Sequence, residues 1–270
     1  MLKNYSTIIS QLSRNVSLKS TVNVDEIQKF SKMASNWWDV DGPLKAIHSL
    51  NKLRTPFFEK GIRSYQKSTV ENAYNSQALP LAGFQVLDVG CGAGILSESL
   101  GRLGAKVTGI DPSEENIEVA YQHAKKINLN NVSYEVKTIE NFQLCNSTLF
   151  DAVIASEVIE HVDNQELFIE KCSELLKPGG SLFITTQNRT AASWALVILG
   201  AEYVLNVVPR GTHDWKKFIT LDEMISFLGK NNCQLRQVRG YTYNPLMNNW
   251  DWIKTTDINY ALHATKVVDK

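Results

Sequence analysis

Cysteine is scarce in this chain of 270 residues, and no two cysteines stand at a spacing typical of a metal or redox motif. The four positions are Cys91, Cys145, Cys172 and Cys233. The pattern therefore indicates neither a disulfide framework nor a structural zinc site. We expect the chain to work in a reducing compartment.

An excess of either charge is also missing, since 28 lysine and arginine residues balance 28 aspartate and glutamate residues. Without net basicity or a one-sided basic cluster, nucleic acid is a poor candidate partner. Internal repeats and linker-like segments are absent from the sequence as well. The length is sufficient for one well-buried domain with a helical cap.

The sequence has no apolar run long enough to cross a membrane. Its most apolar stretch, residues 194–208 (WALVILGAEYVLNVV), is interrupted by Gly200, Glu202 and Asn206 and is too short for about 30 Å of hydrocarbon. Two alternatives remain for this stretch. It is either a buried lid helix or an interfacial helix that rests one apolar face in lipid.

Acidic residues are missing from the first 24 positions, which contain Lys3, Arg14, Lys19 and several serines and threonines before the first acid, Asp25. This composition is typical of a mitochondrial transit peptide. The alternative is an ordinary disordered basic tail. We favour targeting because the acid-free segment ends where a helical pattern starts, and because the mitochondrial matrix is reducing.

The most informative stretch that is present is VLDVGCGAG, residues 86–94, which joins a short apolar run to a glycine loop. The apolar run is typical of a buried parallel strand. The glycines let the chain turn sharply and leave room where a ligand must come close. This combination predicts a nucleoside-cofactor site, with Asp88, Gly90 and Gly92 as candidate binding residues.

A dinucleotide fingerprint is the competing interpretation, but it requires a third glycine where this chain has Ile95. Asp88 would also place a carboxylate beside the phosphates of such a ligand. A carboxylate suits a cationic ligand better, such as an amino-acid ammonium or a sulfonium. The stretch resembles the first motif of the class I methyltransferases that use S-adenosyl-L-methionine.

A second short strand, residues 106–111 (KVTGID), ends in Asp111 at the spacing that places a carboxylate on ribose hydroxyls. The alternative role of Asp111 is a helix cap, which Ser113 supplies better. A third unit, residues 132–136, precedes a loop at residues 137–141 where the adenine ring would lie. Asp111 is therefore the predicted ribose ligand.

Two further strands are predicted at residues 150–155 and 181–186, the second after a helix stop at Pro178 and two glycines. Five such strand–helix units predict a doubly wound α/β sheet. Ligands of such sheets bind at the carboxyl ends of the strands, so we expect Gly90, Asp111, Ser156 and Glu157 to cluster.

With these motifs placed, the chain is similar to the ubiquinone biosynthesis O-methyltransferases over roughly residues 25–268. The stretches that carry the resemblance are FSKMASNWWDVDGPLKAIHSLNKLR, SEVIEHV, TTQNRT and GTHDW. The resemblance implies methyl transfer from S-adenosyl-L-methionine to polyprenylated catechol intermediates. It also implies a mostly parallel seven-stranded sheet with an antiparallel C-terminal hairpin and an N-terminal helical cap.

The resemblance further implies which residues bind the cofactor and a metal. The cofactor positions are Arg54, Gly90, Asp111 and Ser156, where Arg54 would bind the methionine carboxylate as a guanidinium fork. Ser156 differs from the bulkier apolar residue of some members. The implied metal ligands are Glu157, Glu160 and His161, for Mg²⁺ or another divalent ion.

Methyl transfer to a phenol needs an aligned donor and a deprotonated oxygen, because a phenolic pKa lies near 10. Glu157, Glu160 and His161 stand at i, i+3 and i+4, which would place them on one face of a helix where an ion could hold both catechol oxygens. The alternative is a solvated helix start. The candidate catalytic residues are His161 and, in the stretch GTHDW, His213.

Three domains are expected: a transit peptide at 1–24, a helical cap at 25–80 and the methyltransferase domain at 81–270. The cap helices should cover the cofactor mouth. The resemblance implies peripheral association with the matrix side of the inner membrane and membership of a multi-subunit complex. Two other functions remain open, namely methylation of a small soluble phenol and a non-catalytic assembly subunit.

Overall fold

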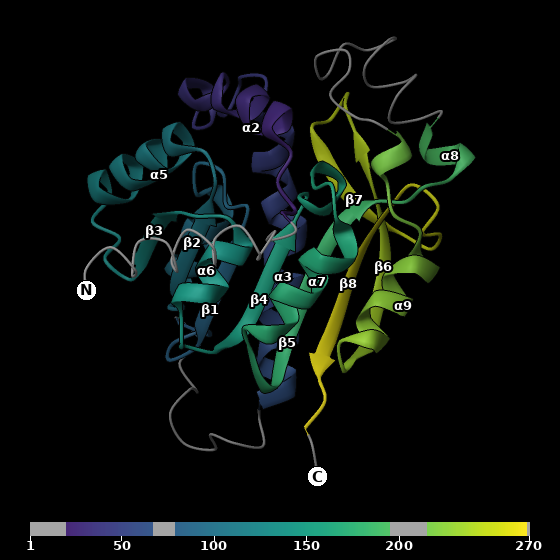
Figure 1. The fold of residues 1–270 in the computed structure, drawn as a ribbon. Helices are drawn as coiled ribbons and strands as arrows, with labels where there is room; N and C mark the ends of the chain where they lie inside the picture. Colours follow the sequence, from purple (N-terminus) through teal and green to yellow (C-terminus); the bar gives the residue numbers. More distant parts are fainter. Residues whose placement is uncertain (1–19, 67–78, 195–214, 269–270) are drawn as a thin grey trace, which may run out of the picture.

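The computed structural model of the chain describes residues 20–66, 79–194 and 215–268 (Figure 1). A central sheet runs through these residues, with helices on both faces. The strands are β1 (Gln85–Val89), β2 (Lys106–Asp111), β3 (Val132–Val136), β4 (Phe150–Ser156), β5 (Leu176–Gln187), β6 (Cys233–Asn244), β7 (Asn249–Ile253) and β8 (Asn259–Lys266). The helices of four or more residues are α2 (Val24–Ser31), α3 (Lys45–Gln66), α4 (Ile95–Arg102), α5 (Glu114–Lys126), α6 (Ile139–Cys145), α7 (Gln165–Glu174) and α9 (Leu221–Lys230).

The described strands form one sheet in the order β3-β2-β1-β4-β5-β8-β6-β7. The first five are parallel, and β8, β6 and β7 pair antiparallel. This confirms the predicted doubly wound, mostly parallel sheet. The added strand is β7, whose sequence NWDWI alternates polar and aromatic residues and lacks the aliphatic run that marked the other strands.

Alternation along the strands divides the core into two layers. Leu87 and Val89 of β1 face the layer that contains Phe168 of α7 and Met224 of α9. Val86 faces the opposite layer, to which α3 contributes Leu50, Phe57, Phe58 and Ile62. Figure 1 shows α7 and α9 in front of the sheet and α3 behind it. Both faces are buried, as expected for parallel strands that read as continuous apolar runs.

Capping bonds define the starts of α5, where Ser113 was predicted to cap, and of α9. The Ser113 hydroxyl accepts from the Asn116 amide at the start of α5. Thr220 and Glu223 form a reciprocal capping box at the start of α9. Both caps satisfy amide groups that have no partner inside the helix.

The N-terminal segment, expected as one or two helices over the cofactor mouth, forms two helices that lie in different places. Residues of α2 line the cavity described below, together with Trp37 just after it. Helix α3 instead packs against the sheet, where Phe58 and Ile62 are fully buried. Apolar residues recur along α3 and form a stripe that packs against β5 and β7, beside α4.

None of the helices in the described part of the chain is long and apolar enough to cross a membrane. The apolar stretch at 194–208 lies outside the described residues except for Trp194, whose side chain is exposed. Its two alternatives therefore stay predictions, as do the three domain boundaries.

Candidate functional site

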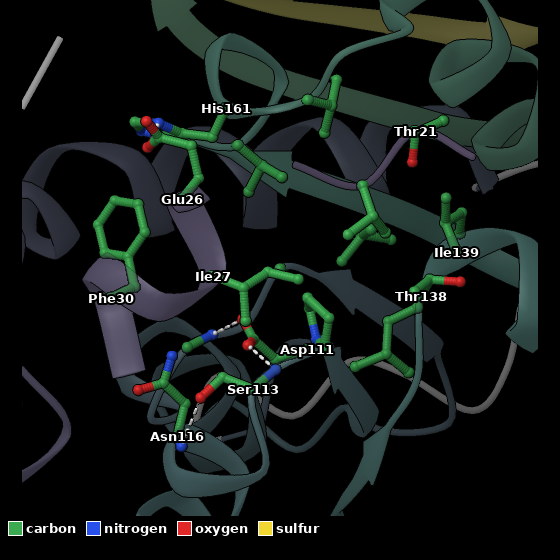
Figure 2. A pocket seen from close by; sticks show the side chains of 18 of the residues that line it. Thr21, Glu26, Ile27, Phe30, Asp111, Ser113, Asn116, Thr138, Ile139 and His161 are labelled. Atoms are coloured by element: carbon green, nitrogen blue, oxygen red, sulfur yellow. Dashed lines mark hydrogen bonds and ion pairs between the residues drawn. The ribbon is translucent and has the colours of Figure 1, made fainter. Parts of the chain in front are cut away.

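A cavity of about 140 Å³ lies at the carboxyl ends of β1, β2 and β4. These ends meet where the strand order reverses between β1 and β4, the position at which open α/β sheets bind ligands. Figure 2 shows Glu26, Ile27 and Phe30 of α2 along one side, facing Asp111 at the end of β2 and Thr138 in the loop after β3. Of the residues expected to cluster, Gly90, Asp111 and Glu157 line this cavity and Ser156 does not.

The glycine loop forms one wall of this cavity in a conformation that favours glycine. Gly90 and Gly92 have φ of +68° and +53°. A Cβ at Gly90 would lie 2.6 Å from Val158 Cγ2, and one at Gly92 would lie 2.6 Å from Trp37 Cη2. Side chains are thus excluded at both positions by backbone angle and by neighbours.

Asp111 ends β2 with its carboxylate held at the cavity edge. Oδ2 accepts from the Gly92 amide at 3.0 Å, and Oδ1 accepts from the Ser113 amide at 2.9 Å. Burial raises the pKa of Asp111, and these amide bonds and the Asn116 side chain oppose that shift. The remaining lone pairs of a fixed carboxylate suit a ribose diol, which is the predicted role.

The loop after β3 also reaches the cavity, as predicted for the adenine position. Lys137, Thr138 and Ile139 line it. Thr138 caps α6 by accepting from the Asn141 amide at 3.3 Å, which fixes this corner. Ile139 is 3% exposed and offers an apolar surface on which a flat ring can lie.

Arg54 and Ser156 meet on the other face of the sheet, away from the cavity lining. The Arg54 Nη1 donates to the Ser156 hydroxyl at 2.8 Å, and its Nε donates to Asn51 Oδ1 at 2.7 Å. Burial lowers the pKa of Arg54, while the nearby Glu157 and Asp88 carboxylates oppose that shift. The structure thus brings Arg54 and Ser156 into contact, on the face of the sheet opposite the cavity.

Asp88 lies in the same layer and does not line the cavity. Its carboxylate accepts from the Ser97 hydroxyl at 2.6 Å and is 2% exposed as a residue. Strand alternation explains the placement, because Asp88 shares its face with Val86 while Val89 reaches the cavity. Burial raises the pKa of Asp88 to about 6, Asp111 adds to this shift, and Ser97 and Arg54 oppose it.

The predicted helical face of Glu157, Glu160 and His161 is not formed. Glu157 has φ of +60°, so it turns the chain directly after β4. Ile159–His161 is a single 3-10 turn, in which i, i+3 and i+4 do not share the face that an α-helix would give them. The helix expectation was wrong because nothing in the sequence revealed the left-handed residue.

The three side chains have separate partners. Glu157 accepts from the Thr185 hydroxyl at 2.6 Å and from the Gln187 amide at 2.9 Å. Tyr241 also donates to it, at 2.5 Å. The His161 Nδ1 lies 2.8 Å from Glu26 Oε2 on α2.

Glu160 is the side chain that points to a cation. It is 3% exposed, and its Oε1 has no hydrogen-bond partner among the described residues. Burial and the neighbouring Glu157 carboxylate both raise its pKa. A divalent cation between these two carboxylates would relieve the repulsion, so the pair fits an ion. Within the described ranges, however, no three His, Cys, Asp or Glu residues are arranged to hold a metal, because His161 is turned toward Glu26.

The contribution of the segment before and within α2 was not predicted residue by residue. Thr21 donates its amide to Glu140, and Asn23 donates to Asp163 at 2.8 Å. Glu26 makes the contact with His161. These bonds tie the segment across the cavity. Asn23 could have been found as the cap of α2, but its contact with Asp163 has no sequence signal. The candidate base His213 lies outside the described residues.

Comparison with known proteins gives a consistent result. A family model described as "Methyltransferase domain" matches residues 87–184. The ubiquinone biosynthesis O-methyltransferase, mitochondrial, of Rattus norvegicus is 43% identical over 268 residues, which cover 98% of this chain and 76% of that protein. The ubiquinone biosynthesis O-methyltransferase of Pelagibacter ubique is 42% identical over 247 residues, covering 92% of this chain and 99% of that protein.

A solved structure shares the fold. The magnesium protoporphyrin IX methyltransferase from Synechocystis PCC 6803, with bound S-adenosyl-L-methionine, matches with a TM-score of 0.58. The match covers 92% of this chain and 100% of that chain at 16% identity. At this identity the likeness shows the fold alone.

Proposed function

Because this chain belongs to the ubiquinone biosynthesis O-methyltransferases, we propose that it methylates a hydroxyl of polyprenylated catechol intermediates. It is an S-adenosyl-L-methionine-dependent O-methyltransferase. Substrates of the 3,4-dihydroxy-5-polyprenylbenzoate and 3-demethylubiquinol type are the ones proposed. The observation that carries the proposal is the cavity at the strand ends. Asp111, the glycine loop and Glu157 line this one cavity, and the Gly92 amide donates to Asp111.

Binding and orientation are the tasks of the chain's own residues in this reaction. Asp111 accepts from the ribose, and the loop around Gly92 allows the donor to lie against backbone. Holding the phenol oxygen, the methyl carbon and the sulfur in line supplies roughly 7–11 kcal/mol in favourable systems. His161 lines the cavity with its ring held by Glu26, an arrangement in which an imidazole accepts a phenolic proton. His213 stays the second candidate base.

Metal assistance is a separate part of the proposal. Glu157 and Glu160 would hold Mg²⁺ or another divalent ion, which would stabilise the phenolate as a Lewis acid. The unpartnered Oε1 of Glu160 supports this, whereas the placement of His161 does not. Calorimetric titration of the resting protein with Mg²⁺ tests it, with Glu160→Gln as the variant. Binding that is lost in the variant supports the ion, and no heat in either protein removes it from the proposal.

The proposed substrate carries its isoprenoid tail in a bilayer, so we propose peripheral association with the matrix side of the mitochondrial inner membrane. The support is the apolar stretch at 194–208, the acid-free residues 1–24 and the similarity to mitochondrial ubiquinone biosynthesis O-methyltransferases. Membership of a multi-subunit complex is proposed from the family alone.

The direct test measures methyl transfer from labelled S-adenosyl-L-methionine to a prenylated catechol in liposomes and to a soluble catechol without a tail. The proposal predicts at least about ten-fold higher kcat/KM for the prenylated substrate. Equal rates would favour the soluble phenol as substrate. Cofactor binding without transfer to either acceptor would favour a non-catalytic subunit.

A further inference from the structure

Two buried polar atoms on residues that line the cavity lack partners. Trp37 Nε1, a donor, and Asn116 Oδ1, an acceptor, have no hydrogen-bond partner among the described residues. Trp37 is 8% exposed and Asn116 is 1% exposed. Buried polar groups in folded proteins are nearly always hydrogen-bonded, because an unpaired one loses its bonds to water without replacement. Both atoms therefore point to a missing ligand.

The Trp37 ring is held in place beside the glycine loop. A Cβ at Gly92 would lie within 3.0 Å of three ring atoms of Trp37, so the glycine is what lets the indole lie against the loop. The Trp37 carbonyl accepts from His48 Nε2 at 2.7 Å, which fixes the backbone. The amide of the same Gly92 donates to Asp111 Oδ2. The indole is thus packed on the loop whose amide binds the carboxylate of Asp111, the predicted ribose ligand.

Asn116 reaches the same carboxylate from the first turn of α5. Its side chain helps to lower the pKa of the Asp111 carboxyl, and its carbonyl oxygen has no hydrogen-bond partner among the described residues. Its backbone amide donates to the Ser113 hydroxyl at 3.1 Å. Figure 2 shows Asn116 and Ser113 together below Asp111 at the cavity edge. The asparagine is therefore fixed in position by its own helix cap.

The three groups around this corner are one unpaired donor, one unpaired acceptor and a carboxylate. A vicinal diol matches this set, because each hydroxyl can donate and accept at once. The carboxylate of the methionine part of the cofactor does not match this set, because the Asn116 carbonyl oxygen and the Asp111 carboxylate would both repel it. Thr138 and Ile139, in the loop where the adenine is expected, line another part of the cavity.

We propose that Trp37 and Asn116 are specificity-determining residues for the ribose of the methyl donor. Trp37 Nε1 donates to one ribose hydroxyl oxygen, and Asn116 Oδ1 accepts from a ribose hydroxyl. The N-terminal segment thus supplies a direct cofactor contact as well as a cover. This inference rests on the proposed function in that it takes S-adenosyl-L-methionine as the ligand.

The test is calorimetry of the full chain with S-adenosyl-L-homocysteine and its 2′-deoxy and 3′-deoxy analogues. Trp37→Phe should weaken S-adenosyl-L-homocysteine binding about five-fold, the size of one neutral hydrogen bond. The variant should bind one of the two deoxy analogues as well as the wild type does, because the bond is already absent there. Asn116→Ala should show the same pattern with one analogue.

Trp38→Phe is the matched control, since Trp38 packs in the same apolar cluster and its indole already donates to the Ala93 carbonyl at 3.1 Å. Any loss in this control should be equal for all three ligands. Equal losses for all three ligands in Trp37→Phe and Asn116→Ala would overturn the inference, since packing alone would explain them. If Trp37→Phe does not fold by circular dichroism, Asn116→Ala decides. Absence of binding by the wild type would instead contradict the proposed function.

Discussion

Replacing Asp88 by asparagine should change how the stability of the protein depends on pH. The Asp88 carboxyl is buried below the glycine loop, and its pKa is raised to about 6 from an ordinary value of 3.8. An acid whose pKa is raised by folding binds its proton more tightly in the folded state. Its contribution to stability is therefore fully present below about pH 4 and is lost as the pH rises through 6.

The size of the effect follows from the shift. A difference of about two pKa units at about 1.36 kcal/mol per unit gives a loss of about 3 kcal/mol between the acid plateau and pH 8. Most of this loss should fall between pH 4 and 7. The side-chain amide of the Asp88→Asn variant cannot titrate in this range, so the variant should lack this part of the pH dependence. An unpaired amide hydrogen in the variant would add a cost that does not change with pH.

Urea denaturation of both proteins from pH 4 to pH 8 measures the effect. The stability of the wild type minus that of Asp88→Asn should fall by about 2.5 kcal/mol over this range, because a small part of the loss occurs below pH 4 and other titrating groups cancel in the difference. Ser97→Ala serves as the control, because it removes the hydroxyl that holds the pKa of Asp88 down. In Ser97→Ala the fall should extend to higher pH. A difference that stays constant with pH would refute the burial argument.

Four further substitutions test the site. Gly92→Ala would place a Cβ 2.6 Å from Trp37 Cη2 at φ of +53°, so cofactor affinity by calorimetry should fall at least about ten-fold, and unchanged affinity would count against the loop geometry. Arg54→Met removes the donor to Ser156 and the cation between two carboxylates, so cofactor affinity should also fall about ten-fold; full affinity would place Arg54 outside the site. Tyr241→Phe removes a donor to Glu157 and should lower the free energy of unfolding by about 1.5–3 kcal/mol in urea, whereas no loss would mean that this bond is not formed. Glu26→Gln weakens a partly exposed pair with His161, so stability should change by less than about 1 kcal/mol while cofactor dissociation in stopped flow becomes faster; an unchanged rate would remove α2 as a cover.

The parts of the site that were predictable are those with a local signal. Asp111 follows a short strand at a characteristic distance from the glycine loop, and Ser113 leaves it free by capping α5. Both facts depend on residues near one another in sequence. The same is true of the five parallel strands, whose apolar runs reflect burial on both faces.

The parts that were not predictable depend on long-range placement. Asp88 faces the layer of α3 and α4 because of strand parity, and the sequence cannot tell which of two buried faces holds the ligand. Glu157 adopts a positive φ, which the sequence does not predict because this angle is uncommon for glutamate. The role of Trp37 depends on contact with Gly92, which is 55 residues further along the chain and has no sequence pattern of its own.

The central claim is that the methyl donor binds in the cavity between the strand ends and α2. A crystal structure of the protein with S-adenosyl-L-homocysteine tests it most directly. The ribose hydroxyls should lie within hydrogen-bond distance of the Asp111 carboxylate, with the adenine beside Ile139. A ligand bound elsewhere, or an empty cavity at saturating ligand, would contradict the account.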